Sequence, residues 1–230
     1  MTTSSPAPTS SRRDAYEPGL VERTVHEFLS SLQRGYLADE ASAVSRLAQL
    51  RRGAGKAPEE VPELFGLTGT ERLYTEGGRG RSSKHAPVAV HLAVTLYALH
   101  QQSQRSHRMH VPGRRLGGAV RALMPPGEID EALRRRFVRV AGADSANVLA
   151  YRLRDVVLLL RRAGEPLDYA RLADQLERAL DSGKRLQVRQ EWGREFHSWR
   201  PPKDTEAAEG TGATNASDDG GTPATDQPTE

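Results

Sequence analysis

The feature that most constrains this chain is the spacing of its apolar residues, which is helical between residues 15 and 200. Val21, Val25, Phe28 and Leu32, for example, recur at intervals that place them on one face of a helix. The same spacing predicts helices that end at Gly53 and Gln102, others over residues 118–123, 128–141, 149–160 and 168–180, and a last one over residues 188–199. Since we find no alternation typical of strands, the sequence predicts an all-α fold of two small helical bundles.

The ends and breaks of this pattern predict the domain organisation. Asp39 and Asp168 stand where a side chain can cap the helix that follows, and Leu167 and Leu172 can form a hydrophobic staple around the second cap. A Gly- and Pro-rich stretch over residues 110–118 indicates a boundary. The predicted divisions are a disordered leader (1–14), an N-terminal helical bundle (15–110), a C-terminal helical bundle (111–200) and a disordered acidic tail (201–230).

The charge of the chain is unevenly distributed. Its net charge of +3 combines a tail of one lysine and seven acids with residues 1–200, where 32 basic and 23 acidic side chains give a net charge of +9. A basic body favours polyanionic partners, and only four of the 33 basic residues are lysine. Arginine binds phosphate through two parallel hydrogen bonds, although a GC-rich genome explains the arginine excess equally well. The tail either competes with nucleic acid for the arginines or only keeps the chain in solution.

Several classes of function are excluded by what the sequence lacks. It has no cysteine, which excludes disulfides, cysteine-based zinc sites and a thiol nucleophile, and which suits a cytoplasmic protein. No apolar stretch approaches the ~18 residues of a membrane span, so we expect no membrane partner. Five histidines between His85 and His110 have no nearby carboxylate or cysteine that would complete a metal site. We therefore expect no metal, no cofactor, no catalytic residue and no enzymatic activity.

The strongest candidate for a binding site is the helix predicted over residues 128–141. Ile129, Leu133, Phe137 and Val140 share one face, and four arginines occupy the rest of the surface: Arg134, Arg135, Arg136 and Arg139. Like charges at this spacing repel one another, and an external polyanion would relieve that repulsion. The alternative is an ordinary solvated helix face.

Further basic groups lie near predicted helix ends. Arg114, Arg115 and Arg121 surround a loop that leads into a helix, whereas Arg51 and Arg52 can equally well serve only to complement a helix dipole. A third group precedes the helix that carries Trp192 and Trp199: Lys184, Arg185 and Arg189. Core packing is the favoured role for both tryptophans, with base stacking as the alternative. The segment over residues 77–81 is similar to a single RGG-type RNA-binding loop.

Short motifs in a fixed order resemble the CasB family, the small subunit of the type I-E CRISPR surveillance complex, Cascade. The resemblance covers roughly residues 20–197 and rests on the segments Leu47–Gly53, Leu96–His100, Leu116–Val120, Leu153–Arg154, Leu167–Leu172 and Arg194–Phe196. It implies an all-helical, non-catalytic subunit that stabilises the R-loop and its displaced strand. The partners it implies are guide RNA, the target and displaced DNA strands, the backbone and large subunits of Cascade, and a second copy of the chain.

The resemblance also implies which basic residues contact nucleic acid. The residues that match the family in position are Arg51, Arg52, Lys84, Arg121, Arg135, Arg136 and Arg154. Arg134 and Arg139 join this set through the helix pattern above, and Arg108, Arg114 and Arg115 join it on charge alone. The sequence leaves two other functions open: a helical protein–protein adaptor, and a free-standing protein that binds nucleic acid without sequence preference.

Overall fold

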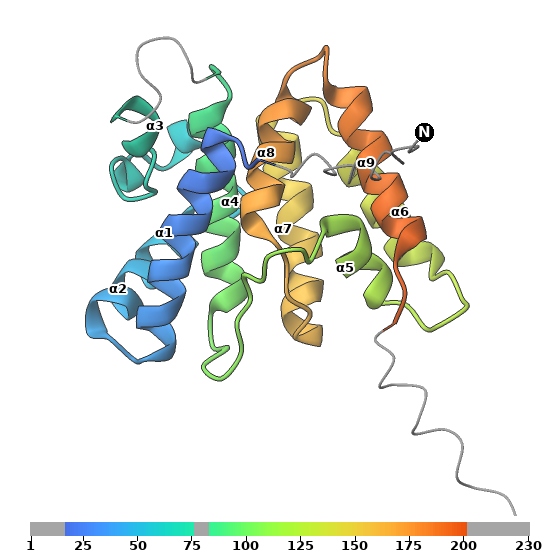
Figure 1. Ribbon diagram of the computed structural model, residues 1–230, viewed down its shortest axis with the longest axis horizontal. Coiled ribbons are helices and arrows are strands. Elements are labelled where there is room, and N and C mark those ends of the chain that lie inside the picture. The colour runs from blue at the N-terminus through green and yellow to red at the C-terminus, as the bar shows by residue number, and fades with distance from the viewer. Residues whose placement is uncertain (1–16, 76–82, 202–230) are drawn as a thin grey trace, which may run out of the picture. The chain divides into compact units, whose positions relative to one another are not determined.

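The computed structural model describes residues 17–75 and 83–201, which form an all-α fold (Figure 1). Its helices are α1 (Leu20–Leu37), α2 (Ala41–Leu50), α3 (Arg72–Thr75), α4 (Ala86–Gln101), α5 (Leu116–Ala122), α6 (Glu131–Ala141), α7 (Ala146–Ala163), α8 (Tyr169–Leu180) and α9 (Arg185–Ser198), with 3-10 turns at Arg51–Gly53, Pro58–Glu60 and Pro62–Leu64. Within the described residues the β-type pairing is one isolated bridge between His110 and Leu167. The predicted all-α class is confirmed; the predicted leader, nearly all of the predicted tail and the 77–81 loop lie outside the described residues.

Helix α4 lies at the centre of the fold, between α1 on one side and α7 and α8 on the other (Figure 1). Of its 16 residues, 14 are buried, because alanine, valine and leucine occupy ten of the positions and lie on every side of the helix. Pro87 in its first turn is compatible with the helix, since the first amide groups have no partner within it. The helix predicted to end at Gln102 ends one residue earlier, at Gln101. None of the helices in the described part of the chain is long and apolar enough to cross a membrane.

The packing of α5 against α9 depends on a glycine. A Cβ atom placed on Gly117 would lie 2.3 Å from the carbonyl oxygen of Trp192 and 2.6 Å from the amide nitrogen of Phe196. The two backbones can approach this closely only because the glycine has no side chain. The same contact lets the Gly117 amide donate to the Glu195 carboxylate, at 3.3 Å.

The segment around His110 joins the two predicted bundles. The side-chain amide of Gln33 on α1 donates to the His110 carbonyl (3.1 Å) and accepts from the His110 amide (2.9 Å). The His110 ring in turn accepts from the amide of Tyr169 at the start of α8, at 3.2 Å. Buried side chains on both sides of this segment belong to one continuous hydrophobic cluster. The hydrophobic core is therefore continuous across the predicted boundary between residues 110 and 111. The division into two bundles remains a prediction.

Two predicted helix caps have different outcomes. Asp168 caps α8 as predicted: its carboxylate accepts from the Arg171 amide at 3.0 Å. The prediction that Asp39 caps α2 is wrong. Asp39 adopts a left-handed backbone conformation with φ of 57°, which aspartate tolerates better than most residues, and its carboxylate pairs with Arg105. The cap position of α2 is Glu40, whose side chain makes no capping bond.

Two predicted helix bounds also differ from the structure. Helix α6 begins at Glu131 and not at residue 128, because the Asp130 carboxylate caps it by accepting from the Ala132 and Leu133 amides at 2.8 and 3.0 Å. Ile129, predicted on its buried face, therefore precedes the helix and is 45% exposed. The last helix ends at Ser198, so that Trp199 lies beyond it and is half-buried.

Candidate nucleic-acid interface

Helix α6 presents four arginines to solvent. Phe137, which stacks on Phe196 with ring centroids 5.6 Å apart, and Val140 are buried and fix the opposite face of the helix against α7 and α9. Because the helix is held on that side, Arg134, Arg135, Arg136 and Arg139 are all exposed. The structure thus brings together the four arginines that the sequence placed in this cluster.

The four arginines of α6 differ in their partners. Arg134 donates to both carboxylate oxygens of Glu131, each at 2.9 Å, and this bonding lowers the pKa of Glu131. Arg135 donates to the carbonyl of Glu131 at 3.2 Å. The guanidinium groups of Arg136 and Arg139 make no hydrogen bond or ion pair with any described residue. These two are therefore free to bind an external anion without breaking a contact within the protein.

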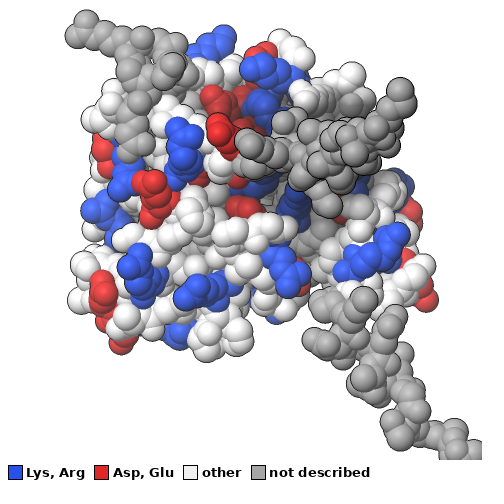
Figure 2. Space-filling model, in the orientation of Figure 1, with Lys and Arg blue, Asp and Glu red and all other residues white. Residues whose placement is uncertain are grey.

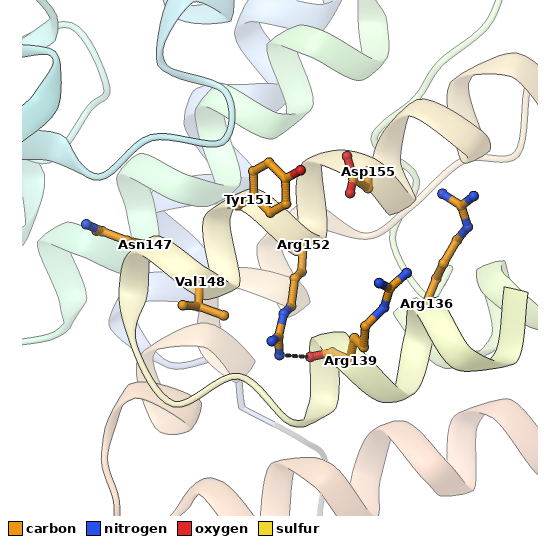
Figure 3. A pocket seen from close by; sticks show the side chains of 7 residues that line it. All are labelled: Arg136, Arg139, Asn147, Val148, Tyr151, Arg152 and Asp155. Carbon is orange, nitrogen blue, oxygen red and sulfur yellow. Dashed lines mark hydrogen bonds between the residues drawn. The ribbon is translucent and has the colours of Figure 1, made fainter. Parts of the chain in front are cut away.

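Arg136 and Arg139 lie along a groove between α6 and α7 that has a volume of about 480 Å³ (Figure 3). Its lining consists of Arg136, Arg139, Asn147, Val148, Tyr151, Arg152 and Asp155. The guanidinium of Arg152 reaches across from α7 and donates to the carbonyl of Arg139 in the last turn of α6. Sequence reasoning missed the α7 residues of this groove. Their signal was present, since they lie off the apolar stripe that runs through Leu149 and Leu153.

A second group of predicted residues surrounds the loop after α2. Arg51 and Arg52 lie in the 3-10 turn Arg51–Gly53 and are both exposed. The aliphatic part of Arg154 on α7 lies over Gly55, because a Cβ atom on that glycine would be 2.5 Å from the Arg154 Cδ atom. The structure therefore places Arg154 beside the loop that follows Arg51 and Arg52, although about a hundred residues separate Arg154 from these two in the sequence.

The predicted group around α5 is divided in the structure. Arg121 donates to the carbonyls of Met124 and Pro125 at 3.4 and 3.1 Å, and its guanidinium lies 5.6 Å from the ring centroid of Trp199. Arg121 is thus already engaged, which the sequence did not indicate. Arg114 and Arg115, on the loop before α5, are exposed and make no side-chain hydrogen bond to described residues.

The remaining predicted residues lie near the two ends of α4 and at the start of α9. Lys84, just before α4, and Arg108, in the loop after it, are exposed. The group at the start of α9 is used mainly within the protein: Arg185 donates to the carbonyls of Ala179 and Asp144, at 3.0 and 3.1 Å. Trp192 is buried and donates to Gln175 at 2.8 Å, so the core role predicted for it is confirmed.

A contrasting set of arginines lies where α8 meets α1 and α9. Arg178 is bonded to Asp174 at 2.9 Å and to Glu191 at 2.7 Å, and Arg171 forms ion pairs with the same two acids. These partly buried pairs neutralise their guanidinium groups within the fold.

The surface of the molecule shows a broader distribution of positive charge. On the face seen in Figure 2, Lys and Arg side chains cross the lower part of the surface, where few acids lie among them.

The buried histidines are structural. Burial lowers the pKa of His110 to about 4, and its ring accepts a backbone hydrogen bond that requires the neutral form. His100 bonds the hydroxyl of Tyr169 at 2.9 Å, and burial lowers its pKa to about 4 as well. Among residues 17–75 and 83–201, no group of three or more His, Cys, Asp or Glu side chains is placed to hold a metal ion.

Comparison with known families decides the relationship of this chain. Residues 46–197 match the family model described as CRISPR-associated protein Cse2. This chain is a member of the Cse2 family. A comparison with curated protein sequences finds no match.

Solved structures agree with membership of the Cse2 family. The chain is 45% identical to CasB from Thermobifida fusca, with a TM-score of 0.72, and the match covers 79% of this chain and 100% of that one. CasB from M. ruber is 23% identical with a TM-score of 0.53, over 85% of this chain and 98% of that one. A chain of a CRISPR RNA-guided surveillance complex is 19% identical with a TM-score of 0.56, over 82% and 99% of the two chains. The resemblance to CasB predicted from the sequence is confirmed; the last two matches show the fold alone.

Proposed function

We propose that this Cse2-family chain is the non-catalytic small subunit of the type I-E Cascade complex in antiviral defence. In that complex it binds the backbone of guide RNA and target DNA without sequence preference, and it stabilises the R-loop and the displaced strand. Membership of a CRISPR-associated family and the 45% identity to a CasB protein support this proposal.

The observation that carries the proposal is the set of exposed basic side chains without partners in the described fold. The side chains of Arg136 and Arg139 on α6, and of Arg51 and Arg52 in the turn after α2, have no hydrogen bond or ion pair with described residues. A guanidinium of this kind gains most from a phosphate, to which it can donate two parallel hydrogen bonds. Phosphates carry no sequence information, so such contacts suit a complex in which guide pairing supplies the specificity.

The energetics of strand exchange explain why such contacts matter. The heteroduplex that forms in an R-loop is about as stable as the DNA duplex it replaces, so modest backbone contacts decide the balance. Each phosphate that a basic side chain neutralises on a single strand contributes about 0.7 to the logarithmic dependence of affinity on salt. The proposed partners are therefore guide RNA, target and displaced DNA, the backbone and large subunits, and a second copy of the chain. The proposed location is the cytoplasm, with no membrane partner.

Reconstitution tests this function directly. The guide-RNA complex is assembled with and without the full chain, and the unpaired strand of a matched target is footprinted with a reagent that modifies only unpaired bases. We expect the open strand to be lost without the chain and restored when it is added back. An R-loop that is equally stable without the chain would contradict the proposal and favour the adaptor function. An isolated chain that binds nucleic acid tightly and with a strong salt dependence, but leaves the R-loop of the complex unchanged, would favour the free-standing binder.

A further inference from the structure

We propose that the groove between α6 and α7 is a subsite for one nucleotide of an unpaired strand. In this subsite a base stacks on the ring of Tyr151 while Arg136 and Arg139 bind the adjacent phosphate. The inference rests on the proposed function and adds to it that the chain binds an unpaired base as well as the phosphate backbone.

Tyr151 supplies the stacking surface. It is 63% exposed, and its hydroxyl makes no hydrogen bond with the described part of the protein. Its neighbours Ala150 and Leu153 are buried against the core, so the helix holds Tyr151 on the solvent side of α7. In Figure 3 the ring stands on the α7 side of the groove, and Val148 lies one turn before it. An exposed aromatic face of this kind stacks with any base, because every base has a π-face.

The opposite wall of the groove supplies positive charge. Arg136 and Arg139 extend from α6 toward α7 (Figure 3), and Arg152 lies between the two helices with its guanidinium held at the Arg139 carbonyl. Asp155 is the one acid in the lining, so three guanidinium groups face one carboxylate. The excess charge suits a phosphate, while the carboxylate of Asp155 can accept a hydrogen bond from a base amino group.

The groove distinguishes its ligand by geometry. A volume of about 480 Å³ lies in the range of small-ligand sites and can hold a nucleoside monophosphate unit. In a duplex both faces of a base are covered by its stacked neighbours, so only an unpaired base can offer a face to Tyr151. An acidic peptide would satisfy the arginines but would leave the tyrosine ring without a partner. The arrangement of one aromatic ring opposite two free arginines therefore favours a single-stranded nucleic acid.

The test compares two oligonucleotides of equal length and charge, one of thymidines and one of abasic residues. Affinity of the full chain for each is measured by fluorescence anisotropy. We expect the wild type to prefer the thymidine strand by about tenfold, the effect of stacking one base. Tyr151→Ala should abolish the preference, and Tyr151→Phe should keep it. Tyr74→Ala is the matched control, because Tyr74 on α3 is 69% exposed and lies outside the groove; it should change nothing.

The same measurements separate this proposal from the proposed function. If the wild type binds both strands equally, or binds neither, the subsite is refuted. If the wild type binds both strands equally and the double variant Arg136→Gln with Arg139→Gln binds both more weakly, the two arginines bind the backbone and only the stacking subsite is refuted. A polyglutamate peptide that binds as tightly as the thymidine strand would assign the groove to an acidic protein and overturn the subsite. A base preference that persists while the chain has no effect on R-loops in the complex would support the subsite and contradict the proposed function.

Discussion

The close approach of α5 and α9 leads to a quantitative prediction for Gly117→Ala. The new Cβ atom would lie 2.3 Å from the Trp192 carbonyl oxygen and 2.6 Å from the Phe196 nitrogen, whereas ordinary contacts begin at 3.4 Å. Both obstacles are backbone atoms, so the helices must separate by about 1 Å. Overpacking of this kind costs about 1–3 kcal/mol. Separation also weakens the hydrogen bond from the Gly117 amide to the buried Glu195 carboxylate, worth about 1.5–3 kcal/mol.

The helix preference of alanine offsets about 1 kcal/mol of this cost. The free energy of unfolding should therefore fall by roughly 2–4 kcal/mol. Urea unfolding followed by the fluorescence of Trp192, which is buried beside this contact, measures the change. Gly118→Ala is the matched control in the same helix. The nearest atom to its Cβ position is Cδ1 of the half-buried Trp199, at 3.2 Å, so this variant should stay within about 1 kcal/mol of the wild type. Equal effects of the two substitutions would refute the argument.

Two further predictions concern stability. Burial lowers the pKa of His100 and of His110 from 6.5 to about 4, so between these values the unfolded chain binds protons that the folded chain does not. The free energy of unfolding should be at its full value above about pH 6.5 and should fall toward pH 4 by about 3 kcal/mol for each histidine. Urea unfolding across this range should show that the free energy of unfolding of His100→Gln depends less on pH than that of the wild type. An equal pH dependence would contradict a low pKa for His100. Asp130→Ala should lower the free energy of unfolding by about 1 kcal/mol, because α6 loses its cap. Urea unfolding measures the change, with Glu128→Ala, at an exposed residue, as the control. An equal loss of stability in the two variants would exclude the cap as the cause.

Helix periodicity predicted most of the fold because burial follows a repeat that is visible in the sequence. The buried helix α4 could be recognised from its apolar residues, which lie on every side of the helix. Caps were less predictable, since they depend on backbone conformation. Asp168 caps α8, whereas Asp39 takes a left-handed conformation and pairs with Arg105, a residue that is distant in sequence. The extension of α5 back to Leu116 likewise depends on a contact with α9 that no local pattern contains.

The candidate site could be predicted in part. The positions of the α6 arginines followed from the apolar stripe opposite them, but their availability did not. Arg134 is paired with Glu131 and Arg121 lies against Trp199, while Arg136 is free of described partners. Tyr151 was missed because a single aromatic residue on the outer face of a helix is common in sequences. The stacking role proposed for Tyr151 depends on the position of α6 beside α7, which the sequence does not show.

The lifetime of the R-loop in the assembled complex shows whether Arg136 and Arg139 hold the strand. The test variant is Arg136→Gln with Arg139→Gln, and the control is Arg72→Gln with Arg105→Gln, two arginines outside α6 that are already paired with acids. Both variants change the net charge equally. We expect a shorter lifetime for the test variant, a salt dependence reduced by about 1.4 in its logarithmic slope, and little change for the control. Equal effects of the two variants, or none, would contradict the claim that the free arginines of α6 hold the strand.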